Sequence, residues 1–161
     1  MTVLLDSPEI FGHTIFCDDI RFEVDGKFTY VGVYQGTMYV HAVFPVTLPK
    51  FAIAISFYQK KEIFTPSLGL RVFMPGDTED KASIEGEIKG GSSDAEIRAT
   101  IESSDSEKPF VQLGTTAIFT SFVINKPGLI KVRILRNSEM HRLGILRVVS
   151  APVQVQQPPI E

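Results

Sequence analysis

Apolar and polar residues alternate with a period of two along most of this 161-residue chain. Every second residue is apolar over residues 95–101, 68–74 and 130–134, while residues 51–57 alternate large apolar side chains with small ones. Successive side chains of a β-strand point to opposite faces, so this period predicts half-buried strands and argues against amphipathic helices. Parallel sheets would need continuous apolar runs, so we expect the strands to be antiparallel.

Turn-forming residues separate these segments. Asp25-Gly26 lies between residues 21–24 and 27–30, and this dipeptide favours the positive backbone angles of a type I′ hairpin turn. Further turns are expected at residues 75–77, 90–94, 103–109, 125–128 and 136–139. The spacing predicts about nine strands, and thus an all-β, single-domain, antiparallel sandwich or barrel. Residues 13–150 would form this domain, after a lead segment of residues 1–12 and before a Pro-rich flexible tail of residues 151–161.

Two stretches resemble known families. Residues 122–135 contain a Pro127-Gly128 corner followed by an alternating strand, and a polar turn and a last strand come after them. This order resembles the end of many immunoglobulin-like domains, and it implies a sandwich rather than a barrel. Residues 16–34, from Phe16-Cys17 through Gly26-Lys27 to Val31-Gly32, resemble the opening of a family of small uncharacterised bacterial proteins. That resemblance implies a bacterial source but supplies no activity and no functional residues.

Charge and targeting features narrow the classes of partner. Lysine and arginine number 16 against 19 acidic residues, giving a net charge of −3, and the nearest basic cluster is Arg133, Arg136, Arg142 and Arg147. A mildly acidic chain gains little from phosphate neutralisation, so we expect no nucleic-acid partner. The N-terminal residues lack the features of a signal peptide, and no apolar run approaches ~20 residues. We therefore expect a cytoplasmic protein without a membrane partner.

An acidic cluster occurs near the N-terminus at Asp18, Asp19, Glu23 and Asp25. Carboxylates of this kind could bind a hard cation such as Ca²⁺. On a strand, however, Asp18 and Asp19 point to opposite faces and could not chelate one ion together. The favoured interpretation is a salt bridge between Asp19 and Arg21, which would share a face.

The histidines and the single cysteine do not form a motif of catalysis or metal binding. His13, His41 and His141 could bind zinc if the fold gathered them, but their spacing is not that of a known zinc site. Cys17 follows two apolar residues, so we expect a buried, unreactive thiol, and a single cysteine excludes an internal disulfide. No nucleophile or phosphate-binding motif occurs, so we predict neither catalytic residues nor a cofactor or metal.

The best candidate for a contact surface lies in residues 31–39, where two glycines interrupt an apolar, tyrosine-containing segment. Glycines in strands mark bulges or close backbone approach, and tyrosine combines contact area with a polar tip. We predict Tyr34, Met38 and Tyr39 as partner-binding residues.

The leading hypothesis is a non-catalytic protein-binding or adaptor module of a bacterial cytoplasm, with an unknown partner or self-association. The alternatives are a structural, self-assembling subunit of a phage or particle, since strand edges can pair between copies, and an accessory protein of a bacterial defence operon. An enzyme with a dispersed site, using the acidic cluster or the histidines, is a further hypothesis.

Overall fold

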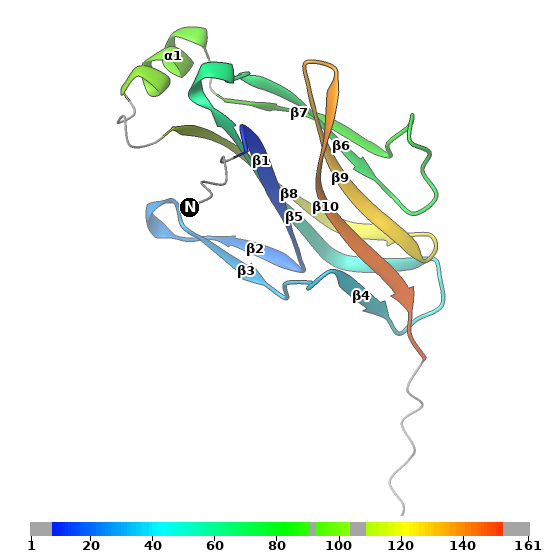
Figure 1. Cartoon of the computed structure of the whole chain (residues 1–161). Helices are drawn as coiled ribbons and strands as arrows, with labels where there is room; N and C mark the ends of the chain where they lie inside the picture. The colour runs from blue at the N-terminus through cyan, green and yellow to red at the C-terminus, as the bar shows by residue number, and fades with distance from the viewer. Residues whose placement is uncertain (1–7, 91–92, 104–108, 153–161) are drawn as a thin grey trace, which may run out of the picture.

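The computed structural model describes residues 8–90, 93–103 and 109–152. The all-β class is confirmed, and within these residues there are ten strands instead of about nine, one α-helix and two short 3-10 turns (Figure 1). The strands are β1 (Ile10–Cys17), β2 (Asp19–Phe22), β3 (Phe28–Val31), β4 (Thr37–Val40), β5 (Val46–Lys60), β6 (Ser67–Phe73), β7 (Ile84–Lys89), β8 (Phe110–Ile124), β9 (Gly128–Arg136) and β10 (Glu139–Ser150). The helix is α1 (Asp94–Ser103), and the 3-10 turns are Val24–Gly26 and Lys61–Ile63.

The strands form three sheets. One has the order β1-β5-β8, a second the order β4-β10-β9-β6-β7, and β2 pairs only with β3. Every pair is antiparallel except β4 with β10, so the prediction of a wholly antiparallel arrangement is wrong at this edge. A parallel pair needs a long connection, and here residues 41–138 lie between the two strands.

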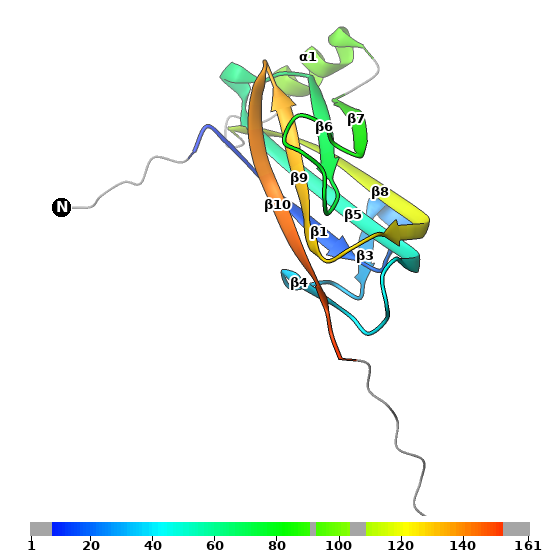
Figure 2. The same cartoon turned by 90° about the vertical axis from the view of Figure 1, so that its right-hand side faces the viewer.

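The main core lies between the three-stranded and the five-stranded sheet, which face each other in Figures 1 and 2. On one side, β5 contributes Phe51, Ile53, Ile55 and Phe57; on the other, β6, β9 and β10 contribute alternate aliphatic residues. This is the period-two pattern of the sequence, with large apolar side chains directed inward. The outer faces of the two sheets are not part of this core, so their side chains are available for other contacts.

A second, smaller core lies on the outer face of the three-stranded sheet. Cys17, Ala52 and Ala54 are buried there beneath Ile20, and Tyr30 packs against the same cluster. The β2–β3 hairpin thus forms a third layer over β1 and β5. The expectation of half-buried strands is therefore wrong for β5, which is buried on both faces over residues 51–55.

Two hairpins follow the expected turn chemistry. Asp25 and Gly26 both have positive φ, 64° and 70°, between β2 and β3. Asn137 and Ser138, also at positive φ, connect β9 to β10, where Arg136 pairs with Glu139. These connections are local in sequence, so the residues of the turn are enough to specify them.

The strand expected at residues 95–101 is wrong: this segment belongs to helix α1. The backbone N–H of Glu96 donates to the Ser93 hydroxyl (3.3 Å). Ser-x-x-Glu is the capping-box pattern of a helix N-terminus, and alanine, glutamate and arginine are good helix formers. Local capping and propensity therefore outweigh the alternation over these seven residues.

The predicted segment boundaries fall near the limits of what the structure describes. β1 begins at Ile10, inside the stretch that the sequence assigns to the lead segment. Of the Pro-rich tail, residues 153–161 lie outside the described residues, and only residues 151 and 152 are placed.

Candidate functional site

Three arginines lie side by side across the outer face of the five-stranded sheet. Arg71 on β6 is paired with Arg133 on β9, and Arg133 is paired with Arg142 on β10. Directly paired residues of neighbouring strands point to the same face, with Cβ atoms roughly 4.5–5.5 Å apart. Like charges in such positions repel each other, so this row of cations needs carboxylates, its own or those of a ligand.

Lys131 and Arg147 extend this cationic surface along β9 and β10. Here, Arg71, Lys131, Arg133, Arg142 and Arg147 are called the arginine face. Two carboxylates pair with it within the described part of the chain: Glu85 lies 3.3 Å from the Arg71 guanidinium, and Glu79 bridges Lys131 and Arg133. Five cations and two carboxylates leave this face positively charged on a molecule whose net charge is negative.

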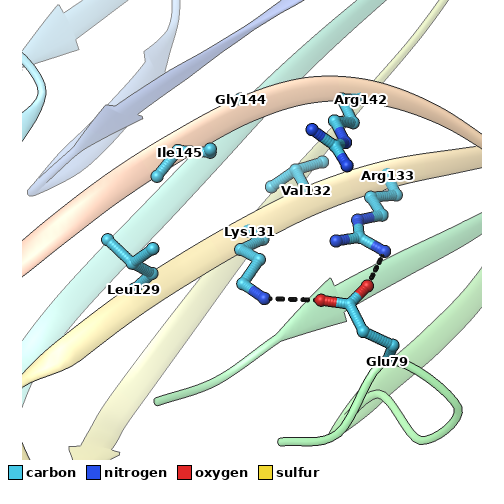
Figure 3. Close-up of a pocket in the computed structure, with 8 residues that line it drawn as sticks. All are labelled: Glu79, Leu129, Lys131, Val132, Arg133, Arg142, Gly144 and Ile145. Atoms are coloured by element: carbon cyan, nitrogen blue, oxygen red, sulfur yellow. Dashed lines mark hydrogen bonds and ion pairs between the residues drawn. The ribbon is translucent and has the colours of Figure 1, made fainter.

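Glu79 reaches the arginine face from the loop between β6 and β7 (Figure 3). Its carboxylate accepts hydrogen bonds from Arg133 and from Lys131 Nζ (2.9 Å for Lys131). The hydrogen bond from Arg133 has the largest effect on the pKa of Glu79, and the hydrogen bond from Lys131 has the next largest. Together they lower this pKa from its ordinary 4.5 to about 2. Glu79 is therefore ionised throughout the neutral range and neutralises part of the face.

The loop that carries Glu79 is shaped by Asp77. The Asp77 carboxylate accepts hydrogen bonds from the backbone N–H groups of Met74 (2.8 Å) and Ser83 (2.7 Å) and from the Ser83 hydroxyl. Partial burial acts to raise the pKa of Asp77, but these hydrogen bonds outweigh it and the pKa is lowered. Asp77 thus joins the two ends of the loop and helps to hold Glu79 above β9.

Arg133 is the most buried cation of the face. Its side chain is only 12% exposed, and its guanidinium lies 4.9 Å from the centre of the Phe73 ring. A cation over an aromatic face is stabilised by the ring quadrupole, and a packed guanidinium loses less entropy when it binds an anion. Arg133 is therefore preorganised to donate hydrogen bonds to a carboxylate.

A cavity of about 230 Å³ opens beside these residues. Lys131, Arg133 and Arg142 lie toward one end with Glu79, and Leu129 and Ile145 lie toward the other (Figure 3). Arg142 is exposed, and no carboxylate among residues 8–90, 93–103 and 109–152 pairs with it. The cavity can therefore take an anionic group at its cationic end and an apolar group at the other.

The residues predicted as a contact surface are not equally accessible. Met38 is 2% exposed and belongs to the main core, so its side chain is not available to a partner in this structure. Tyr34 is half-buried against that core and donates its hydroxyl to Asp18, whereas Tyr39 is 67% exposed. Burial and the Asp18 hydrogen bond raise the pKa of Tyr34 above its ordinary value.

The acidic cluster is divided among separate contacts. Asp19 forms its salt bridge with Lys50 (2.9 Å), not with Arg21 as predicted, and the hydrogen bond from Lys50 lowers the pKa of Asp19. Asp18 accepts from Tyr34, while Glu23 and Asp25 are exposed at the hairpin turn. Across the segments that the structure places, no three His, Cys, Asp or Glu residues are grouped to hold a metal ion.

The histidines lie apart on β1, after β4 and on β10, and they contact different groups. His13 lies beside the Tyr58 ring, His41 Nδ1 is 3.1 Å from the Pro152 carbonyl, and His141 lies against Phe57. Cys17 is fully buried, and burial raises the pKa of its thiol, consistent with the expected unreactive side chain.

The arginine face combines residues that the sequence noted only as a nearby basic cluster with residues that it missed. Arg133, Arg142 and Arg147 were in that cluster, but Arg136 turns away to Gln59 (2.8 Å) and the Ile63 carbonyl. Arg71 and Glu79 are missed, because the pairing of β6 with β9 brings Arg71 to this face and the β6–β7 loop brings Glu79. The alternation of Lys131 and Arg133 with buried aliphatic residues was the available signal of a cationic strand face.

Within the described chain no helix has the length and apolar character to cross a membrane. Comparison of the chain with protein-family models, with curated proteins and with solved structures finds no match. The resemblance of residues 16–34 to a bacterial family therefore stays a prediction.

Proposed function

We propose that this protein is a non-catalytic binding module whose arginine face takes an acidic segment of a partner protein. The observation that carries the proposal is which cations of this face form ion pairs with carboxylates and which do not. Glu79 already places one carboxylate on Lys131 and Arg133, while Arg142 beside them has no carboxylate partner in the described segments. A partner's carboxylate on Arg142 would relieve the repulsion within the row of arginines.

The chemistry of the cations favours a carboxylate ligand. A guanidinium can donate two parallel hydrogen bonds to one carboxylate, and such charge-assisted pairs are stronger than neutral hydrogen bonds. Arg133 is held over Phe73, so part of the site is ordered before the ligand arrives. A local positive surface on an acidic molecule also orients an acidic partner as it approaches.

The apolar end of the cavity indicates what should flank the acidic residues. Leu129 and Ile145 are exposed beside Lys131 and Arg142. An acidic segment followed by a few aliphatic residues would bury these side chains while its carboxylates meet the arginines. We therefore infer a mixed acidic and aliphatic peptide segment as the ligand.

The test uses a fluorescent peptide with a run of glutamates next to a run of leucines, titrated with the full chain and followed by anisotropy. Arg142→Glu should weaken binding at least about tenfold, since it puts a like charge against the ligand. Lys27→Glu, the same change of charge at the exposed β2–β3 turn, is the matched control and should bind as the natural chain does. Equal binding by both variants would remove the arginine face from the proposal.

The same peptide with lysine in place of each glutamate tests whether the charge of the ligand matters. It should not bind, whereas the acidic peptide should lose affinity in 0.5 M salt because exposed charges are screened. Pull-down of a tagged chain from its host, with Arg142→Glu in parallel, would then identify the natural partner. A partner recovered equally by both chains binds elsewhere.

The immunoglobulin-like topology, the bacterial source and the cytoplasmic location are retained here as proposals, supported by the sequence patterns described above. So are the alternative roles as a self-assembling phage or particle subunit and as an accessory protein of a defence operon. Among these alternatives, the uncharged edge of β8 favours self-association.

A further inference from the structure

The free side of β8 is the longest unpaired strand edge that the structure describes. β8 has 15 residues and pairs only with β5, at the margin of the three-stranded sheet (Figure 2). The other edge strands are shorter: β1 has eight residues, β7 six and β4 four. An unpaired edge exposes a row of backbone N–H and C=O groups that can pair with another strand.

β8 also lacks the features with which proteins usually protect such an edge. Its sequence, Phe-Val-Gln-Leu-Gly-Thr-Thr-Ala-Ile-Phe-Thr-Ser-Phe-Val-Ile, contains no charged residue and no proline. β7, the edge of the other sheet, carries Glu85, Glu87 and Lys89 within six residues. Charges and proline discourage pairing at an edge, so β7 is protected and β8 is not.

One hydrogen bond shows which residues of β8 point their backbone N–H and C=O groups toward β5 and which point them away. The Lys61 N–H donates to the Pro109 carbonyl (3.0 Å), so odd-numbered residues here direct their backbone groups toward β5. In an antiparallel pair these directions alternate, so even-numbered residues point theirs away from β5. The regular outward row runs from Gln112 to Thr120 and ends at Ser121, where φ is 55° and the pairing opposite Pro49 is interrupted.

We propose that two copies of this chain pair through β8, antiparallel and about a two-fold axis at Thr116. The two three-stranded sheets would then form one six-stranded sheet, β1-β5-β8-β8-β5-β1, which is an ordinary size. The inference does not depend on the proposed function, because the arginine face lies on the other sheet.

The sequence of β8 fits a second copy of itself. In a two-fold pair every residue meets a residue of the same segment, and β8 has no charged residue that would be buried or opposed there. With the axis at Thr116, Gly114 lies opposite Ile118 of the partner copy. Ile118 is 41% exposed, and the glycine leaves room for its side chain across the new pair. In the same way, Thr115 of one copy lies opposite Ala117 of the other.

The first measurement is the mass of the full chain by sedimentation or light scattering over a range of concentrations. We expect a species of twice the chain mass of 17.9 kDa. Thr116→Lys and Thr116→Glu should each give monomers, because each places a like charge against its own copy. An equimolar mixture of the two variants should restore the dimer. A natural chain that stays monomeric at every concentration would overturn the proposal.

A control and a cross-link separate this interface from other modes of pairing. Val43→Lys adds the same charge at an exposed loop position and should remain a dimer. Thr116→Cys should form a disulfide between copies, since Cα atoms of a directly opposed, hydrogen-bonded pair are about 5.5 Å apart. Val43→Cys should not. A dimer of natural mass that Thr116→Cys fails to cross-link, or that persists in Thr116→Lys, would show that the copies pair elsewhere.

Discussion

The outer faces of the two main sheets differ in what covers them. On the three-stranded sheet, the small residues Cys17, Ala52 and Ala54 lie beneath the β2–β3 hairpin. On the five-stranded sheet, the corresponding positions carry long cations, Arg71, Arg133 and Arg142. Both faces come from strands with period-two alternation. The size and charge of the outward-pointing residues therefore decide whether a further layer packs on a sheet.

The largest effect is expected where the hairpin packs on the small core. Ile20→Ala removes a buried side chain from that core and should lower the free energy of unfolding by about 2–5 kcal/mol. Val24→Ala on the same hairpin is the control, because Val24 is 81% exposed and should cost under about 0.5 kcal/mol. Urea denaturation measures both. Equal, small effects would mean that the hairpin adds no stability to the fold.

The next effect concerns the connection that follows β3. Gly32 has a φ of 66°, and a Cβ there would lie 2.0 Å from Asp18 Oδ2. Gly32→Ala should therefore cost more than Gly36→Ala, which has a φ of 83° and an open surrounding. Backbone strain alone costs about 1–2 kcal/mol, and Gly32→Ala adds the displacement of Asp18 from Tyr34. Thermal melting of both variants tests this, and equal melting temperatures would contradict it.

A smaller, pH-dependent effect on stability is expected at the arginine face. The pKa of Glu79 falls from 4.5 to about 2 on folding, so its stabilisation is full above pH 4.5 and is lost as the pH falls through about 2. Glu79→Gln should thus be less stable than the natural chain at pH 7, and the two should converge near pH 2. Asp19, Asp77 and Glu87 also have lowered pKa values but are present in both chains. A difference in unfolding free energy that is independent of pH would show that Glu79 acts through packing.

The smallest effect on stability is expected at Arg142. Arg142→Ala removes an exposed cation that has no carboxylate partner in the described segments, so the free energy of unfolding should change by under about 0.5 kcal/mol. Binding of the acidic peptide should weaken in the same variant. A large loss of stability would identify Arg142 as part of the fold instead of the binding surface.

Local features of the fold could be predicted from the sequence. The Asp25-Gly26 hairpin and the last hairpin depend on residues adjacent in the chain, and both predictions are confirmed. The segment at residues 95–101 shows the limit of periodicity alone, because Ser93 and Glu96 specified a helix start that alternation concealed. The capping pattern was the stronger signal there.

The candidate site could be predicted only in part, because it depends on strand register. Lys131, Arg133 and Arg142 lie on two consecutive strands, so a hairpin prediction could place them together. Arg71 and Glu79 reach them only through the pairing of β6 with β9 and the folding of the loop around Asp77. Likewise, the parallel pairing of β4 with β10 joins the two halves of the chain, and no local residue pattern specifies it.

The position of Cys17 under the β2–β3 hairpin makes it a natural reporter of local opening. Its thiol is fully buried and becomes accessible to a modifying reagent only when the hairpin lifts from β1 and β5 or when the whole chain unfolds. The rate of labelling at increasing urea would separate these two events, since partial opening exposes less surface than global unfolding. The third layer thus lets a single native residue report whether this part of the fold opens before the rest.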